Sequence, residues 1–193
     1  VEEMVKKARE HFGEPVRILV NNAGNAGAGA NPTIADPTVP FWESTPRMWD
    51  AWLGVNLHGV LNTSRHVIPG MIEQKDGRII TIISDAGRVG EPNLAVYSAA
   101  KAGAAGLMRA LARALGRYNI TVNSVAIAIT RTPRTEARIQ DAERLAKVMK
   151  KYVIRRVGEP SDVANMALFL ASDASSWITG QTYPVNGGYS FNL

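Results

Sequence analysis

The chain has 193 residues, of which 46% are apolar and 20% charged, and its formal net charge is +5. These proportions are those of a globular domain with a hydrophobic core, and they exclude a disordered chain. The short apolar runs exclude a membrane-spanning helix, which needs roughly 18 apolar residues. The absence of cysteine excludes disulfides, thiolate metal sites and cysteine nucleophiles, and it fits a reducing, cytoplasmic location.

The positive charge raises the question of a nucleic-acid or acidic partner. The basic residues are spread along the chain, apart from a denser stretch between Arg131 and Arg156. Because a modest surplus of charge also serves solubility, we expect neither a nucleic-acid nor a membrane partner. No sequence module typical of nucleic-acid-binding proteins is present. If the chain did bind nucleic acid, its affinity for a duplex would fall steeply with salt.

Apolar, strand-like runs alternate with helical stretches along the chain. A glycine- and proline-rich loop over residues 24–40 has a composition that forbids regular structure. The long helical stretch over residues 46–73 has poor helix formers at its centre, from Asn56 to Gly59. The expected order is helix 1–12, strand 16–20, loop 24–40, helix 46–73, strand 78–83, helix 96–117, strand 120–127, helix 135–151, helix 161–171 and strand 181–185.

This alternation predicts an α/β fold with a doubly wound parallel sheet in three α/β/α layers, forming one domain over residues 1–193. The runs VRILV, RIITII and ITVNSVAI are nearly all apolar, as strands buried on both faces should be. Ligands of such sheets bind at the carboxyl ends of the strands. The candidate positions are therefore Asn21, Ser84 and the residues that follow Val125.

The chain opens on Val1 rather than methionine, and its first residues already have the pattern of an amphipathic helix. The first visible strand would also leave an open edge, which a buried parallel strand does not tolerate. We therefore expect that an N-terminal portion carrying the first strands of the sheet is missing from this sequence.

Tyr97 and Lys101 lie four residues apart in a helical segment, so they share one face of the helix. An ammonium close to a phenol favours the phenolate, which lowers a tyrosine pKa from about 10 toward neutrality. We therefore expect Lys101 to tune Tyr97 into a general acid and base. The same spacing occurs on many helix surfaces, so the pair alone is weak evidence for catalysis.

Ser84 follows the strand RIITII, at the edge where a parallel sheet holds its ligands. Its hydroxyl can donate to a substrate carbonyl and stabilise the charge that develops on the oxygen. The turn-rich stretch SDAGRVGEPNLAVY then leads into the helix, so it can bring Ser84 beside Tyr97. The alternative is a strand-end hydroxyl that caps a turn.

Several motifs, taken in order, resemble the short-chain dehydrogenase/reductase family. NNAG at 21–24 looks like the motif after the family's fourth strand, and VNLHG at 55–59 resembles the segment with its catalytic asparagine. The serine, tyrosine and lysine discussed above match the other catalytic residues in type and spacing. The segment 155–188 is similar to the family's closing segment almost throughout. The resemblance covers nearly the whole chain and implies a Rossmann-like, NAD(P)-binding domain.

The resemblance implies a role for each catalytic residue. Tyr97 would exchange a proton with the substrate oxygen while hydride moves to or from the nicotinamide. Lys101 would hold the ribose hydroxyls as well as tune Tyr97, and Ser84 would orient the carbonyl. Asn56 would hold a water that links Lys101 to solvent; the alternative is a polar residue that satisfies a helix kink.

The resemblance also implies which residues line NAD or NADP. Asn21, Ala23 and Gly24 would line the adenosine half, Gly24 because only a residue without Cβ permits close approach of the backbone. Thr132 matches the threonine that meets the nicotinamide carboxamide. The loop expected to reach the nicotinamide ring includes Ile127, Ala128 and Thr130.

Three positions depart from the family pattern. Ile127-Ala128 stands where the family usually has Pro-Gly, which bears on the pose of the cofactor. Asn186 replaces the usual aspartate before two glycines. The loop after NNAG is roughly ten residues longer than in typical members, and it either shapes the substrate entrance or is a tolerated surface insertion.

The glycines at 24, 27 and 29 do not form the phosphate-binding loop of a dinucleotide site. They are spaced as GxxGxG and are followed by prolines rather than by a helix N-terminus. The family's own glycine-rich fingerprint follows its first strand, and the residue that selects NAD or NADP follows the second. Neither strand is visible in this sequence, so the choice between NAD and NADP stays open.

The basic stretch after Thr132 matches the family's substrate lid. We expect the substrate to be an acyl thioester of CoA or of an acyl carrier, or a related small ketone, because such a lid can meet phosphates. The alternative is a solvated amphipathic helix. Some parts of the sequence resemble hydroxyacyl-CoA dehydrogenases, and others resemble 3-oxoacyl-[acyl-carrier-protein] reductases. The charged residues of the lid are Arg134, Arg138, Arg144, Lys147, Lys150, Lys151, Arg155 and Arg156, with Glu136, Asp141 and Glu143.

A second reading of the chain is a non-catalytic scaffold or partner subunit. The intact catalytic set argues against it, whereas the change at Ile127-Ala128 keeps it open; it predicts nicotinamide binding without turnover. The family usually pairs through its two central helices and its C-terminal strand region. We therefore expect a homotetramer or homodimer in which residues 46–73, 96–117 and 181–193 form the contacts.

Overall fold

The computed structural model describes residues 1–25 and 39–191, except for the side chains of residues 137 and 138. Most of the loop expected over residues 24–40, including its predicted insertion, lies outside the described residues. The α-helices are α1 (Glu2–Phe12), α2 (Pro46–Leu53), α3 (Gly59–Gln74), α4 (Ala86–Val89), α5 (Ala95–Leu115), α6 (Glu136–Gln140), α7 (Ala142–Met149) and α8 (Pro160–Ala171). The strands are β1 (Ile18–Asn21), β2 (Gly77–Ser84), β3 (Ile120–Ile127) and β4 (Thr182–Val185). Shorter helical turns are η1 (Phe41–Glu43), η2 (Gly54–His58), η3 (Pro92–Leu94), η4 (Gly116–Tyr118) and η5 (Asp173–Ser175).

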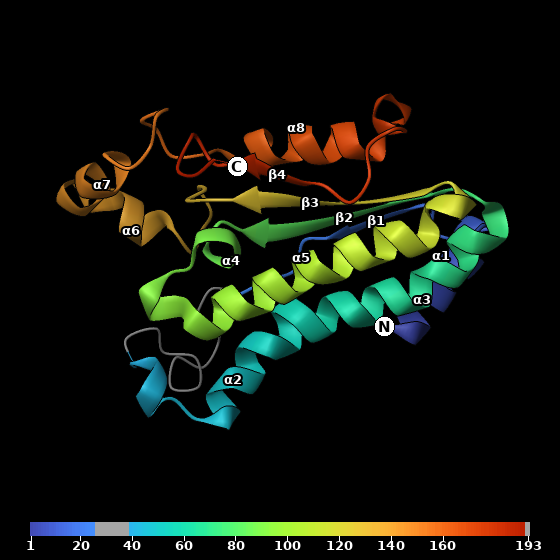
Figure 1. Ribbon diagram of the computed structural model, residues 1–193, viewed down its shortest axis with the longest axis horizontal. Helices are drawn as coiled ribbons and strands as arrows, with labels where there is room; N and C mark the ends of the chain where they lie inside the picture. The colour runs from blue at the N-terminus through green and yellow to red at the C-terminus, as the bar shows by residue number, and fades with distance from the viewer. Residues whose placement is uncertain (26–38, 192–193) are drawn as a thin grey trace.

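The four strands form one parallel sheet in the order β1-β2-β3-β4. Figure 1 shows α3 and α5 on one face of this sheet and α8 on the other, with α6 and α7 beyond the carboxyl ends of the strands. The predicted three-layer, doubly wound arrangement is therefore confirmed. None of the helices within the described ranges is long and apolar enough to cross a bilayer.

Two of the predicted helices are interrupted. The stretch 46–73 is formed by α2 and α3, with the π-helical turn η2 between them, where the sequence has poor helix formers. The stretch 135–151 is divided into α6 and α7 at Asp141, whose carboxylate accepts a hydrogen bond from the Arg144 N–H at 3.0 Å and so caps α7. Side-chain capping of this kind competes with continuation of the preceding helix.

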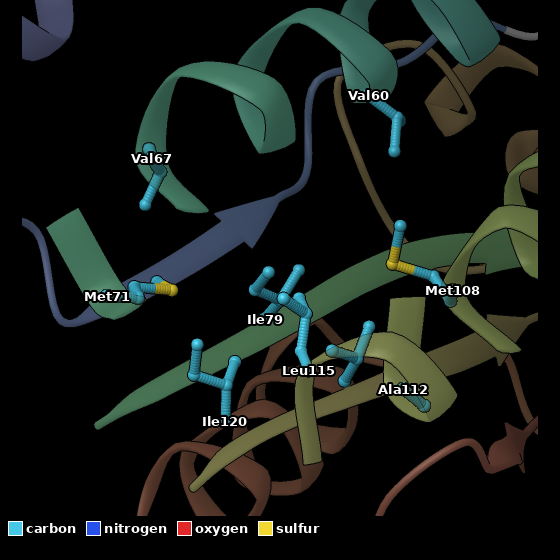
Figure 2. Packing of buried hydrophobic residues seen from close by; sticks show 9 residues of the cluster. Val60, Val67, Met71, Ile79, Met108, Ala112, Leu115 and Ile120 are labelled. Carbon is cyan, nitrogen blue, oxygen red and sulfur yellow. The ribbon is translucent and has the colours of Figure 1, made fainter. Parts of the chain in front are cut away.

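Side chains of β2 alternate between the two faces of the sheet, as a strand requires. Ile79 packs with α3 and α5, where it joins Val67, Met71 and Leu115 in a buried cluster (Figure 2). Ile80 and Ile82 point to the opposite face and pack with α8 through Leu170. Each side chain buried in this way contributes about 1.5–3 kcal/mol to stability. The two clusters pack on both faces of β2 and β3, the inner strands of the sheet.

β1 departs from the expectation that all three apolar strands are buried on both faces. Leu19 packs against the cluster under α3, but Ile18 and Val20 are each 44% exposed. Ile18 and Val20 lie on the face that α8 covers, and α8 packs on β2, β3 and β4. An apolar run therefore predicted the strand correctly but not the extent of its burial.

Candidate active site

Ser84 is the last residue of β2, at the carboxyl edge of the sheet. Its Oγ accepts a hydrogen bond from the Ala86 N–H at 3.2 Å, as in a strand-end turn, and its side chain is close enough to Tyr97 to lower the pKa of that phenol. The reading as a strand-end hydroxyl in a turn is therefore confirmed, because the hydroxyl accepts from the first N–H of α4. The role of Ser84 toward a substrate carbonyl stays a prediction. The stretch between Ser84 and Tyr97 folds into α4 and η3 and returns the chain to the same edge of the sheet.

Tyr97 and Lys101 lie in α5 and reach the same region of the sheet edge. Lys101 is 5% exposed, and its Nζ donates a hydrogen bond to the Ile82 carbonyl at 2.9 Å. The same nitrogen lies 5.8 Å from the centre of the Tyr97 ring. The predicted shared helix face therefore brings the two side chains together, but the ammonium bonds to a strand carbonyl.

Burial decides the protonation of this pair. It raises the pKa of Tyr97 above its usual 10.0, and the hydrogen bond with Ser84 lowers it by less. Burial also lowers the pKa of Lys101 to about 8. The expectation that the pKa of Tyr97 is lowered is thus wrong for this structure, because removal of the phenol from water raises the pKa by more than the hydrogen bond with Ser84 lowers it. Tyr97 is a neutral phenol near pH 7 and can act as a proton donor.

Asn56 lies within the π-helical turn η2 and is completely buried. Its Nδ2 donates to the Trp52 carbonyl at 3.0 Å and to the Asn25 carbonyl at 2.9 Å. Its Oδ1 accepts from the Asn25 N–H at 3.3 Å. The amide therefore satisfies the irregular helix, as the alternative reading proposed, and also clamps the end of the NNAG segment. A relay water at Asn56 stays a prediction.

Gly24 lies where the NNAG segment meets α5, close to Lys101. A Cβ at this position would lie 3.1 Å from Asn56 Oδ1 and 3.2 Å from Lys101 Nζ, tighter than ordinary contacts. The Gly24 backbone therefore approaches these two side chains closely, whereas its predicted approach to the cofactor stays a prediction. Ala23 beside it is exposed.

Asn21 is buried at the end of β1 and links three elements of the fold. Its Nδ2 donates to Thr81 Oγ1 of β2 at 3.1 Å, and its Oδ1 accepts from Thr63 Oγ1 of α3 at 2.6 Å. Its side-chain amide thus has a structural task, and a cofactor contact at Asn21 stays a prediction.

The loop after β3 brings the other predicted cofactor residues to the same edge. Ile127 is paired with Ser84 in the sheet, and Ala128 follows directly. Thr130 and Thr132 are held in a turn by Thr135, whose Oγ1 donates to the Thr130 carbonyl at 2.7 Å and accepts from the Thr132 N–H at 2.8 Å.

Thr135 lies in the predicted lid, but its role in the turn was not predicted. The spacing of three residues between Thr132 and Thr135 was the available signal. From the same lid, Arg134 Nη1 donates to the Gly24 carbonyl at 3.4 Å, which joins the lid to the NNAG segment.

Known proteins share both the sequence and this arrangement. A family model described as Enoyl-(Acyl carrier protein) reductase matches residues 1–190. The chain is 37% identical to the 3-oxoacyl-[acyl-carrier-protein] reductase FabG of Thermotoga maritima over 188 residues, which cover 97% of this chain and 71% of that protein. It is 39% identical to the (2S)-[(R)-hydroxy(phenyl)methyl]succinyl-CoA dehydrogenase subunit BbsD of Thauera aromatica. This match extends over 190 residues, which are 98% of this chain and 71% of that protein.

The fold has the same relatives. The crystal structure of 3-oxoacyl-[acyl-carrier protein] reductase from Brucella melitensis superposes with a TM-score of 0.85 and 34% identity, over 98% of this chain and 69% of that one. The chain belongs to the short-chain dehydrogenase/reductase family. It is accordingly an NAD(P)-dependent oxidoreductase that acts on CH–OH groups. The family resemblance of the motifs and the Rossmann-like fold are both confirmed.

The residues at this edge fit the nicotinamide and ribose end of the short-chain dehydrogenase cofactor. Lys101 has three N–H donors on its Nζ. Within the described residues one acceptor, the Ile82 carbonyl, faces that nitrogen. A buried ammonium favours further acceptors, and ribose hydroxyls supply them. Ala23, Gly24 and Thr132 are exposed at the same edge, so a ligand can reach them.

Two cavities lie near this edge of the short-chain dehydrogenase fold. A small one of about 30 Å³ lies beside Tyr97, with Trp49, Trp52 and Leu94 in its wall. A larger one of about 590 Å³ lies between α8 and β4, and Thr130 contributes to its wall. The smaller cavity is the one that contacts Tyr97, so the volume of a cavity does not identify the candidate site here.

Proposed function

We propose that the chain interconverts a ketone and a secondary alcohol carried on an acyl thioester, with Tyr97 as the proton donor and acceptor at the substrate oxygen. The observation that carries this proposal is that the Ser84 side chain, at the end of β2, interacts with the Tyr97 phenol of α5 closely enough to lower its pKa. The two O–H groups thus lie at the edge of the sheet where ligands bind. A carbonyl oxygen placed between them can accept from both.

The proton and the hydride travel separately in this reaction. NAD(P)H, when bound, supplies the hydride that reduces the carbonyl carbon. The Tyr97 phenol gives its proton to the carbonyl oxygen, which its raised pKa favours because the phenol stays protonated at neutral pH. Ser84 donates a hydrogen bond to the same oxygen and stabilises its developing charge. In the oxidative direction the same groups act in reverse.

Lys101 and Asn56 act around the reacting atoms, Lys101 on the cofactor and Asn56 on the NNAG segment. We assign Lys101 to the ribose hydroxyls, since its ammonium is buried and is held by the Ile82 carbonyl at 2.9 Å. Asn56 positions the NNAG segment through Asn25. We assign Ala23, Gly24, Thr130 and Thr132 to the cofactor.

The acyl thioester is favoured by the basic lid. Four of its cations, Arg144, Lys150, Lys151 and Arg155, are exposed, and in the described part of the chain no carboxylate lies within ion-pair distance of them. Unpaired surface cations suit the phosphates of CoA or of an acyl-carrier prosthetic group. The names of the relatives from Thermotoga maritima and Thauera aromatica point to thioesters of the same two kinds.

The reduction of acetoacetyl-CoA with NADH and with NADPH tests this function. Tyr97→Phe removes only the phenolic O–H, so we expect kcat to fall by about 10²–10⁴-fold, the usual contribution of a general acid. Tyr118→Phe is the matched control, because Tyr118 lies in η4 and stacks on Arg117 away from the site.

Two outcomes would contradict the proposal. An undiminished rate in Tyr97→Phe would show that the phenol does not transfer the proton. Binding of NADH or NADPH without turnover of any ketone by the unsubstituted chain would favour the non-catalytic scaffold instead.

The expected homotetramer or homodimer is kept as a proposal. Along α5, Ala99 and Gly103 are exposed, whereas Ala100 is buried within the subunit. The two exposed small residues permit the close approach of a helix from a second copy of the chain. Sedimentation equilibrium of the unsubstituted chain and of Gly103→Gln tests this, since the longer side chain should weaken association; unchanged association would contradict the contact.

A further inference from the structure

The residue after Ser84 carries a buried carboxylate that the reaction does not use. Asp85 is 2% exposed, and its two oxygens accept hydrogen bonds from Arg88 Nη1 and from Asn186 Nδ2, both at 2.6 Å. Its N–H donates to the Ile127 carbonyl at 3.0 Å, which extends the pairing of β2 and β3 past Ser84. A carboxylate is buried only when such partners replace water.

The partners of Asp85 hold the segment that follows β4. Arg88 donates from Nη1 to Ser190 Oγ at 2.7 Å and from Nη2 to the Phe191 carbonyl at 2.9 Å. Asn186 donates to the Ser190 carbonyl at 2.9 Å. The segment 186–191 therefore folds back onto α4, although Asp85 and Asn186 lie 101 positions apart in the sequence.

The opposite side of α4 rests on the catalytic helix. A Cβ at Gly87 would lie 2.8 Å from Lys101 Cβ and 2.8 Å from the Ala102 nitrogen, so the backbones of α4 and α5 touch at the catalytic lysine. The first N–H of α4, at Ala86, donates to Ser84 Oγ. The position of α4 thus sets the Ser84 hydroxyl relative to the side chains of α5.

We propose that Asp85, Arg88 and Asn186 are positioning residues, which clamp α4 between the segment 186–191 and α5 and so hold the Ser84 hydroxyl against Tyr97. The effect on turnover rests on the function proposed above, whereas the clamp itself does not. Loss of the clamp should lower kcat with little change in KM, because the substrate still binds while the two O–H groups lose alignment.

An exchange of the acid and the amide tests the clamp. Asn186→Asp places a second carboxylate against the buried Asp85, and Asp85→Asn removes the charge that Arg88 pairs with. We expect each to lower kcat by about 10–100-fold, the cost of a misaligned catalytic group. The double variant Asp85→Asn/Asn186→Asp restores one carboxylate and one amide, and it should recover most of the loss. Asn62→Asp, at an exposed position of α3, is the control for added charge.

A readout that does not depend on turnover separates this proposal from the proposed function. Arg88→Lys is a milder variant that keeps the charge and loses the two-nitrogen contact. In this variant, amide hydrogen exchange should accelerate in residues 84–90 and in residues 186–191 together. Amides of β3 should keep their protection. This result is expected even if the unsubstituted chain reduces no ketone.

The clamp is overturned by either of two results. One is a double variant whose kcat is reduced by as much as the reductions in the two single variants combined. The other is exchange that accelerates in one of the two segments and leaves the other unchanged. Full activity of Asn186→Asp and Arg88→Lys would likewise show that α4 needs no such support.

Discussion

The side chains of Ser84 and Tyr97 interact with each other, although one residue ends β2 and the other lies in the first turn of α5. The contact works against burial, which raises the pKa of Tyr97, because a hydrogen bond to the phenol oxygen favours its charged form. The site therefore holds a protonated phenol whose acidity a single serine moderates.

Ser84→Ala should slow turnover without unfolding the chain. Loss of one donor to a developing oxyanion costs about 10²–10³-fold in kcat. The pKa of Tyr97 should also rise further, so the alkaline limb of the rate profile moves to higher pH. Ser64→Ala is the control, since the Ser64 hydroxyl is buried in α3 with no hydrogen-bond partner in the described part of the chain. A kcat equal to that of the unsubstituted chain would contradict the role of Ser84.

Lys101 should make the protein more stable as the pH rises from about 8 to 10. Its pKa is lowered from 10.5 to about 8 in the folded state, so the unfolded chain binds more protons in this window. The free energy of unfolding then increases with pH, by at most about 1.4 kcal/mol per pH unit. Tyr97, with a raised pKa, opposes this only above its usual 10.0.

Urea unfolding between pH 7.5 and 10 measures this slope. Lys101→Met should flatten it, because the methionine has no proton to lose, while Lys147→Met on the exposed surface of α7 should leave it unchanged. The same slope in all three proteins would show that Lys101 is not desolvated in the folded state.

Gly24→Ala should impair the site more than the fold. The new Cβ would lie 3.1 Å from Asn56 Oδ1 and 3.2 Å from Lys101 Nζ, so one of these side chains must shift by a few tenths of an ångström. We expect kcat/KM to fall by about 10-fold or more, since small displacements of catalytic groups are costly. Gly116→Ala meets nothing within 4 Å and is the matched control. Equal kinetics of the two variants would contradict a close approach at Gly24.

Met71→Ala should destabilise the cluster under α3. Met71 is 0% exposed, and truncation of such a side chain costs about 2–5 kcal/mol of unfolding free energy. Met4→Ala, at a position 57% exposed, should cost less than about 0.5 kcal/mol. Chemical denaturation measures both, and a similar loss in the two variants would argue against the packing in Figure 2.

Several elements of the fold could be predicted because their signals are local. Apolar runs predicted three of the four strands, and the fourth was expected over residues 181–185. β3 has the expected bounds, and all but its last residue are buried. The break at Asn56 was visible as poor helix formers, although its π-helical form was not. The cap at Asp141 was missed, since a continuous pattern of apolar positions concealed it.

By itself, the sequence determined which side chains could share a face or a strand end, since period and spacing fix those within one element. Two such features are the helix face shared by Tyr97 and Lys101 and the place of Ser84 at the end of β2. Tertiary structure decided what each group experiences. Burial raised the pKa of Tyr97 where proximity alone predicted the reverse. Packing also joined Asp85 to Asn186 across 101 residues, because a buried carboxylate takes its partners from whichever elements the fold brings to it.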